Sequence, residues 1–311
     1  MLATTTPVSA LELRDAVRSG RNLDGSRLNR ILGLDPMHGL LEVQAATPWH
    51  SIAEELRPGD ARAAALRTTM STVGESTARN AAGPDGVPIV EHVASLTLVM
   101  PDGELRRVSR NRDRELFALT VGGHGLFGTL YSITLRVATL AQSVERAMRP
   151  DEMTLRPGAR AKHALDLLLP PDAVGPFMQE ADTRCGDWRV PLQAVTVRKT
   201  LQEEDTYLRW ARRDYAEVRL AFAEASDIGG SVRGVQLRHE LIDAAIAAGG
   251  SFQIASTLEA TREQTEACYP QLKGFLAEKR RFDPSERLVN DWYLHQRALL
   301  TQPPCEVRWQ H

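Results

Sequence analysis

Apolar and polar residues alternate along this chain in short runs, which predict short strands separated by short helices. The first runs predict a helix that Ser9 caps and Gly20 ends, then two strands joined by a turn, and a second helix that Thr47 or Pro48 opens. These four elements are expected at residues 9–19, 31–35, 40–45 and 47–56.

Two glycine-bearing segments follow, at residues 72–83 and 122–128. Glycine takes positive φ and lets the main chain approach another group closely, so both segments are candidate cradles for a flat or phosphorylated ligand. Tight turns are the alternative interpretation of the same glycines. The regular elements expected around them are strands at 95–100, 104–108 and 128–137 and a helix at 113–119.

Prolines and a glycine interrupt the pattern at residues 148–160, which we interpret as a linker or hinge. Beyond it the apolar runs predict a second sheet covered by helices. Strands are expected at 163–169, 193–198, 218–222 and 251–256, and helices at 173–183, 234–248 and 262–278. Short strands with inserted helices indicate an α+β fold, with domains at residues 1–147 and 148–311.

The composition indicates which ligands and which cellular compartment to expect. The 311 residues are 42% hydrophobic and carry a net charge of −2, so no global basic field favours nucleic acid or an anionic membrane. Cys185, Cys268 and Cys305 have no metal-ligand spacing and suit a reducing compartment. The sequence shows no leader-like N-terminus and no apolar run of membrane-spanning length. We therefore expect a soluble cytoplasmic protein without a metal site.

Several motifs together suggest a family. They read T-V-G at 72–74, N-A-A-G at 80–83, L-T-L-V-M-P-D-G-E at 96–104, V-G-G-H-G-L-F-G at 121–128 and E-K-R-R-F-D-P at 278–284. In this order they resemble the FAD-linked oxidases, the vanillyl-alcohol-oxidase-like flavoproteins with a PCMH-type FAD-binding domain. The sugar-oxidising branch that includes decaprenylphosphoryl-ribose oxidase looks closest. The resemblance covers about residues 7–297.

The resemblance implies a two-domain PCMH-type fold, here with a shortened FAD-binding domain. An antiparallel-sheet cap domain would supply substrate contacts, and its C-terminal tail would return to the first domain. The implied reaction is oxidation of an alcohol or sugar CH–OH group by hydride transfer to the flavin. By resemblance, the cofactor-binding residues are Thr72, Val73, Gly74, Asn80, Gly83, Gly122, Gly123, Gly125 and Gly128.

Four departures from the family pattern bear on the cofactor. Gly20 passes almost directly to residues 22–28, where relatives carry a glycine-rich pyrophosphate loop. Glu75 replaces a glycine, Ala82 replaces a flavin-proximal histidine, and residues 256–258 lack the family's tyrosine, histidine and arginine. Lost charge-assisted hydrogen bonds, at about 1.5–3 kcal/mol each, predict FAD binding that is weak or lost.

Three side chains are candidates for proton transfer: His92, His124 and Lys279. Each has a plainer alternative, namely packing for His92, a turn histidine for His124 and a solvated basic face for Lys279. Trp210 and Tyr215 are candidates to line a substrate pocket, with packing as the alternative.

These observations leave three functions open. The first is an FAD-dependent oxidoreductase acting on CH–OH groups of a small alcohol or sugar-like molecule. The second is a degenerate flavin-fold pseudoenzyme that serves as a partner subunit or binds a metabolite. The third is a redox-neutral enzyme that uses the same pocket.

Overall fold

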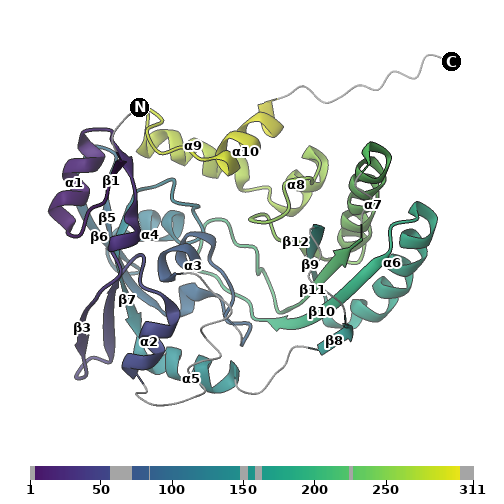
Figure 1. Ribbon diagram of the computed structural model, residues 1–311, viewed down its shortest axis with the longest axis horizontal. Helices are drawn as coiled ribbons and strands as arrows, with labels where there is room; N and C mark the ends of the chain where they lie inside the picture. The colour runs from purple at the N-terminus through teal and green to yellow at the C-terminus, as the bar shows by residue number, and fades with distance from the viewer. Residues whose placement is uncertain are drawn as a thin grey trace. The chain divides into compact units, whose positions relative to one another are not determined.

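The chain forms two compact units in the computed structural model, which describes residues 4–56, 72–83, 85–147, 153–157, 163–223 and 227–301 (Figure 1). Unit 1 comprises Met1–Asp151, Thr200–Arg213 and Ala277–Leu288. Unit 2 comprises Glu152–Lys199, Asp214–Leu276 and Val289–His311. Each unit contains a five-stranded sheet with helices packed on it, so the fold is α+β.

Unit 1 is built on a sheet of strand order β3-β4-β7-β5-β6, in which all neighbours are antiparallel. A separate parallel pair joins β1 to β2, and α1 connects them. The strands are β1 (Thr4–Thr5), β2 (Asn22–Leu23), β3 (Ile31–Asp35), β4 (Leu40–Gln44), β5 (Val93–Val99), β6 (Leu105–Ser109) and β7 (Thr129–Arg136). The helices are α1 (Ala10–Arg18), α2 (Trp49–Leu56), α3 (Val73–Arg79), α4 (Arg114–Thr120) and α5 (Val137–Ala147), with short 3₁₀ turns at Gly25–Arg27 and Ile89–Glu91.

Alternation places the core of unit 1 on one set of strand positions. Leu41, Val43, Leu96, Leu98 and Ile133 are fully buried, as the period of two requires for a sheet with one covered face. Helix α1 docks on β5 through a cluster of apolar residues. This cluster consists of Leu13, Val17, Leu28 and Val99, with Tyr131 packed against it.

Unit 2 has strand order β12-β9-β11-β10-β8. Its strands are β8 (Met153–Arg156), β9 (His163–Leu169), β10 (Leu192–Thr200), β11 (Tyr215–Phe222) and β12 (Ser251–Phe252). Its helices are α6 (Val174–Trp188), α7 (Ile228–Ala247), α8 (Arg262–Cys268), the first part of α9 (Leu272–Phe282) and α10 (Asp291–Thr301), with a 3₁₀ turn at Pro171–Ala173. Helix α7 packs against α6, α8, β9 and β12 (Figure 1).

Several elements differ from those predicted by the sequence pattern. The single helix predicted at 262–278 is two helices, because Pro270 cannot donate to the preceding turn and Tyr269 before it leaves the helical region at φ −130 and ψ 62. The strand predicted at 251–256 ends at Phe252, because the Gln253 carbonyl turns the chain by accepting from the N–H of Thr257 at 3.0 Å.

Two regular elements were not predicted from the sequence pattern. Within the linker predicted at 148–160, Met153–Arg156 pairs with β10 as β8; residues 148–152 and 158–160 lie outside the described residues. Helix α5, directly after β7, was not predicted. Strand β8 has only four residues, so its pairing with β10 decides its conformation. Helix α5 carries apolar residues at helical spacing, at Val137, Leu140, Ala141 and Val144, so its local pattern could have predicted it. The thiols of Cys185 and Cys268 are buried, and Cys305 lies outside the described residues.

Candidate functional site

The two glycine segments, residues 72–83 and 122–128, lie against each other in unit 1. The Gly122 N–H donates to the Thr77 carbonyl at 2.9 Å, and the His124 N–H donates to the Ala78 carbonyl at 2.8 Å. Gly122 takes a φ of +73, and a Cβ there would lie 3.2 Å from the Cβ of Asn80. A glycine is therefore required where the second segment crosses the end of the first.

Most of the first segment is a helix, where a loop was expected. Thr72 caps α3 by accepting the Glu75 N–H on its hydroxyl at 3.2 Å, and Asn80 ends the helix in the left-handed region at φ 46. Gly74 packs so closely that a Cβ would lie 2.6 Å from the Ala45 carbonyl oxygen. The glycine thus serves helix packing, and the Glu75 side chain is exposed.

The main-chain N–H groups of several predicted cofactor-binding residues already donate to carbonyls of the protein. Their bonds are Val73 to Thr47 at 3.0 Å, Gly74 to Ala45 at 2.7 Å, Gly83 to Val87 at 2.8 Å and Gly123 to Thr120 at 3.0 Å. Gly125 and Gly128 take φ values of +76 and +149, which other residues rarely adopt. A phosphate at Val73, Gly74, Gly83 or Gly123 would have to replace an existing hydrogen bond.

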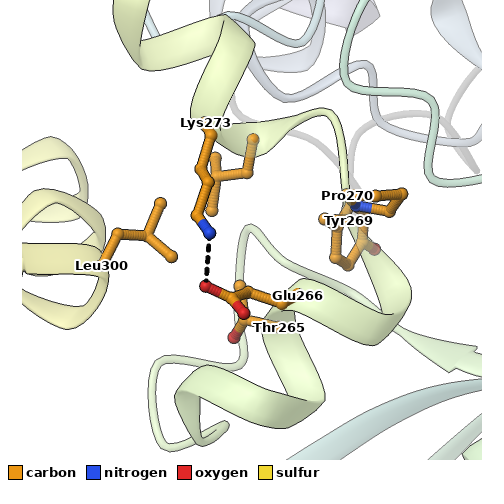
Figure 2. A pocket seen from close by; sticks show the side chains of 7 residues that line it. Thr265, Glu266, Tyr269, Pro270, Lys273 and Leu300 are labelled. Atoms are coloured by element: carbon orange, nitrogen blue, oxygen red, sulfur yellow. Dashed lines mark ion pairs between the residues drawn. The ribbon is translucent and has the colours of Figure 1, made fainter. Parts of the chain in front are cut away.

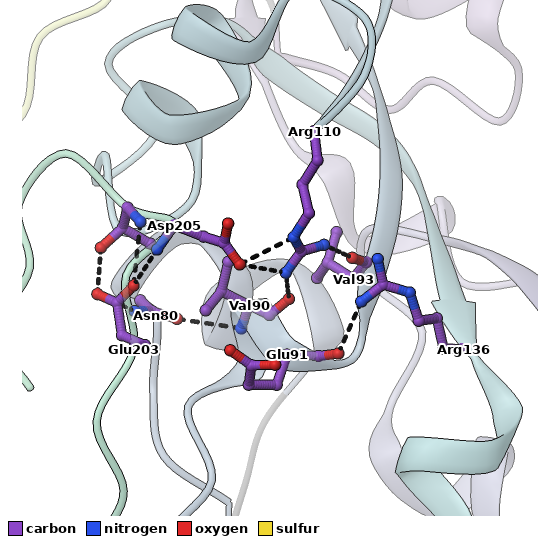
Figure 3. A network of polar contacts seen from close by, with 9 residues as sticks. Asn80, Val90, Glu91, Val93, Arg110, Arg136, Glu203 and Asp205 are labelled. Atoms are coloured by element: carbon purple, nitrogen blue, oxygen red, sulfur yellow. Dashed lines mark hydrogen bonds and ion pairs between the residues drawn. The ribbon is translucent and has the colours of Figure 1, made fainter. Parts of the chain in front are cut away.

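Asn80 is a fully buried hydrogen-bond hub between the first segment and Thr200–Arg213 (Figure 3). Its Nδ2 donates to Glu203 Oε1 at 3.3 Å, and its Oδ1 accepts the Val90 N–H at 3.1 Å. Its carbonyl oxygen accepts the indole N–H of Trp210 at 3.1 Å. Both the oxygen and the nitrogen of the Asn80 amide therefore form hydrogen bonds within the protein.

Arg110 forms a second connection between the Thr200–Arg213 segment and the rest of unit 1 (Figure 3). Its guanidinium pairs with Asp205 at 2.7 Å, and it also donates to the carbonyls of Val90 at 2.7 Å and Val93 at 2.5 Å. The same guanidinium lies 5.2 Å from the centre of the Phe117 ring. Glu203, Asp205 and Arg110 were not predicted as site residues, because a contact across 123 residues, such as Asn80 to Glu203, leaves no local pattern.

His92 follows the 3₁₀ turn that carries Val90, and its side chain is buried. Its Nδ1 lies 3.1 Å from the hydroxyl of Thr139, which itself donates to the Arg136 carbonyl at 3.1 Å. The hydroxyl has one hydrogen, so it accepts from Nδ1, and this assigns the ring proton to Nδ1.

His124 sits in the second glycine segment with a φ of 54. Burial, and to a smaller extent the charge of Arg79, lowers the pKa of His124 to about 3. The imidazole is therefore neutral at pH 7 and holds a proton weakly. A general base works best with a pKa near the working pH, so this environment does not favour His124 in proton transfer.

The pKa of His124 predicts an acid-sensitive contribution to stability. The unfolded chain binds a proton near pH 6.5 and the folded chain only near pH 3, so stability is lost as pH falls from 6.5. Asparagine tolerates positive φ, so His124→Asn should keep the backbone conformation. Between pH 7 and pH 5 we expect the free energy of unfolding to fall by up to about 2 kcal/mol less in this variant than in the parent protein. Urea unfolding at both pH values measures this. His38→Asn, at a side chain that is 68% exposed, is the control, and equal pH dependence in all three proteins would contradict the assignment.

Lys279 is fully buried in α9, where a solvated basic face was the alternative to a ligand contact. Its Nζ lies 2.5 Å from Asp283 Oδ2. Asp283 also accepts the N–H groups of Leu288 at 2.8 Å and Arg287 at 3.0 Å. Burial raises the pKa of Asp283, but these hydrogen bonds outweigh it and hold the pKa below its usual value.

The Lys279–Asp283 pair fixes the turn after α9, and Arg287 in that turn then donates to the carbonyls of Pro101 at 2.5 Å and Val17 at 2.6 Å. Lys279 therefore holds the C-terminal part of unit 1 in place. Trp210 and Tyr215, the candidates for a substrate pocket, are both buried, Trp210 in unit 1 and Tyr215 in β11 of unit 2.

Unit 2 contains a pocket of about 160 Å³ around the corner between α8 and α9 (Figure 2). Glu266 and Lys273 form an ion pair of 2.9 Å beside it. Its lining consists of Thr265, Glu266, Tyr269, Pro270, Leu272, Lys273 and Leu300. None of the residues predicted as catalytic or cofactor-binding lies in this lining.

A comparison with known families gives a match in the N-terminal third of the chain. Residues 9–109 match the model of an FAD binding domain. This match supports FAD as the cofactor and supports a relation to the FAD-binding PCMH-type oxidases at the level of the domain. It suggests a flavin-linked oxidoreductase that binds a small molecule. No curated protein sequence matches the chain significantly.

Five of the predicted cofactor-binding residues do not fit the diphosphate of FAD as its donors. Diphosphate sites in proteins offer main-chain N–H groups that point into a concavity. Here the N–H groups of Val73, Gly74, Gly83 and Gly123 donate to carbonyls, and the amide nitrogen of Asn80 donates to Glu203. Donors to a diphosphate must therefore come from residues other than these five.

The described ranges contain neither a membrane-spanning helix nor a metal cluster. No helix within them has both the length and the apolar character needed to cross a membrane. Within the same ranges, no three histidine, cysteine, aspartate or glutamate side chains gather in a way that would hold a metal ion.

Proposed function

We propose that this protein is a divergent FAD-linked oxidoreductase that oxidises a CH–OH group of an alcohol or sugar-like molecule. The observation that carries the proposal is the match of residues 9–109 to an FAD binding domain. The two compact units, each with its own five-stranded sheet, support a shortened PCMH-type domain and an antiparallel-sheet cap domain. The substrate class rests on the resemblance to the sugar-oxidising branch of the family.

Among the three candidates for proton transfer, His92 has the best support. Its Nδ1 lies 3.1 Å from the Thr139 hydroxyl, which holds the ring in a fixed orientation. A pKa of about 3 disfavours His124, and a buried ion pair disfavours Lys279. In this proposal His92 is the base, and the other two are structural.

A second candidate function is a flavin-fold protein that binds FAD weakly or not at all. The observation that favours it is the use of the Val73, Gly74, Gly83 and Gly123 N–H groups inside the protein. Such a protein would act as a partner subunit or as a metabolite-binding module. Affinity capture from the native host, followed by identification of stoichiometric partners, would distinguish this role from that of a free-standing enzyme.

FAD binding separates the two candidates. For the oxidoreductase we expect the purified protein to show flavin absorbance at stoichiometric amounts, or to gain it on adding FAD. FAD at about 100 times its Kd should stabilise the folded protein by about 2.7 kcal/mol, seen as a rise in Tm. Riboflavin, which lacks the diphosphate, is the matched ligand control. A colourless protein whose Tm does not respond to FAD would remove the oxidoreductase proposal and leave the second candidate.

A further inference from the structure

The carboxyl group of Glu203 is surrounded by hydrogen-bond donors, although its side chain is buried (Figure 3). Oε2 accepts the N–H groups of Asp205 at 2.9 Å and Thr206 at 3.0 Å. Oε1 accepts the hydroxyl of Thr206 and the Nδ2 of Asn80 at 3.3 Å. Each oxygen thus has two donors, as a bound carboxylate requires in the absence of water.

These donors have the character of an anion site. Two successive main-chain N–H groups, a hydroxyl and an amide converge on one point, in the manner of the backbone concavities that bind anions. The charged groups nearby are Arg209, which favours an anion there, and the ion pair of Asp205 with Arg110. Burial raises the pKa of Glu203, while the Thr206 and Asp205 bonds and the Arg209 charge lower it in part.

The donors come from two distant parts of the chain. Asp205 and Thr206 belong to the same segment as Glu203, and only Asn80 belongs to the first glycine segment. The carboxyl group therefore joins Thr200–Arg213 to the residue that ends α3. The Val90 N–H donates to Asn80 Oδ1 at 3.1 Å. Rotating the Asn80 amide toward another ligand would therefore break this hydrogen bond.

We propose that these four donors form a carboxylate-binding site and that Glu203 occupies it as an internal ligand. The family resemblance implies that Asn80, one of the donors, contacts an external ligand. The site holds the Thr200–Arg213 segment on the first glycine segment. The proposal does not require FAD, so it stands or falls separately from the proposed function.

Chemical rescue tests this directly. Glu203→Ala keeps Cβ and removes atoms that correspond to one acetate ion, so acetate is the probe. At pH 7 we expect the variant to lose about 5–10 °C in Tm, and about 100 mM sodium acetate to restore at least half of that loss. Acetamide has the same shape, but its NH₂ group would face the Asn80 NH₂ group, so it should restore clearly less than acetate does.

The neighbouring Glu204 provides the matched control. Its side chain is exposed and accepts the Gln202 amide at 3.1 Å. Glu204→Ala should keep the parent Tm and should respond to acetate as the parent protein does. A Glu203→Ala variant that keeps the parent Tm, or whose Tm responds to acetate no more than that of Glu204→Ala, would overturn the internal-ligand assignment.

A donor-acceptor exchange covers the case in which Glu203→Ala does not fold. Glu203→Gln alone sets an NH₂ group against the Asn80 NH₂ group, whereas Asn80→Asp with Glu203→Gln restores the pairing with reversed roles. In this double variant, the glutamine oxygen still accepts from the N–H groups of Asp205 and Thr206, and the new carboxylate at position 80 keeps an oxygen for the Val90 N–H. We expect the double variant to recover at least half of the Tm lost by Glu203→Gln. A double variant less stable than Glu203→Gln would refute the proposal.

Discussion

Replacing Lys279 with methionine is expected to reduce the free energy of unfolding by about 3–5 kcal/mol, the usual cost of leaving one partner of a buried ion pair alone. Both side chains are at most 1% exposed, and the carboxylate of Asp283 would remain buried with the N–H groups of Arg287 and Leu288 as donors. The loss should shrink at acidic pH, because protonation then removes the unpaired charge. Urea unfolding at pH 7 and pH 4 measures both effects.

Lys273→Met is the control for this change, because it lies in the same helix and makes the same substitution. Its side chain is 59% exposed and its ammonium pairs with Glu266, and exposed pairs contribute at most about 1 kcal/mol. If Lys279 contacted a ligand and its ion pair did not stabilise the fold, Lys279→Met would have nearly the same free energy of unfolding as the parent protein. That result would return Lys279 to the list of catalytic candidates.

Replacing Trp210 with alanine is expected to cost about 3–5 kcal/mol, the range for removing a buried aromatic side chain. Trp210 is 3% exposed, and its indole N–H bonds to the Asn80 carbonyl at 3.1 Å. The variant should therefore detach the Thr200–Arg213 segment from the Asn80 hub. Chemical unfolding gives the energy, and hydrogen exchange at Asn80 and Val90 reports on the hub.

Trp210→Phe separates packing from the hydrogen bond. It keeps most of the apolar volume and loses the N–H, so we expect a loss of about 1–2 kcal/mol. Should Trp210 instead line a substrate pocket, Trp210→Ala would leave stability within about 1 kcal/mol of the parent, the usual range for side chains outside the core, and only ligand binding would change. The size of the stability loss therefore decides between the two interpretations of this side chain.

Local signals predicted many elements well where the pattern was strong. The strand at His163–Leu169 has the predicted bounds, and the helix that Ser9 caps runs from Ala10 to Arg18. The turn at Asp102 and Gly103 joins β5 to β6 as expected, since Gly103 takes a φ of +85. In each case the residues that specify the element lie within it or beside it.

The glycine segments show where local signals fail. The T-V-G run predicted a loop, but a threonine followed by a short helical stretch is also an N-cap, and α3 begins there. Gly74 is a glycine because the Ala45 carbonyl, from another element, leaves no room for a Cβ. A glycine required for packing and a glycine required for a ligand look the same in a sequence.

The sequence by itself determined the α+β class, most strands and helices, and the relation of residues 9–109 to an FAD binding domain, because periodicity and short motifs are local. Only the tertiary structure decided what Asn80, Glu203 and Lys279 do. Their side chains are buried, and the Asn80 amide reaches Glu203 across 123 residues of chain. A buried polar group must find a partner wherever the fold supplies one, and no spacing along the chain encodes which partner that is.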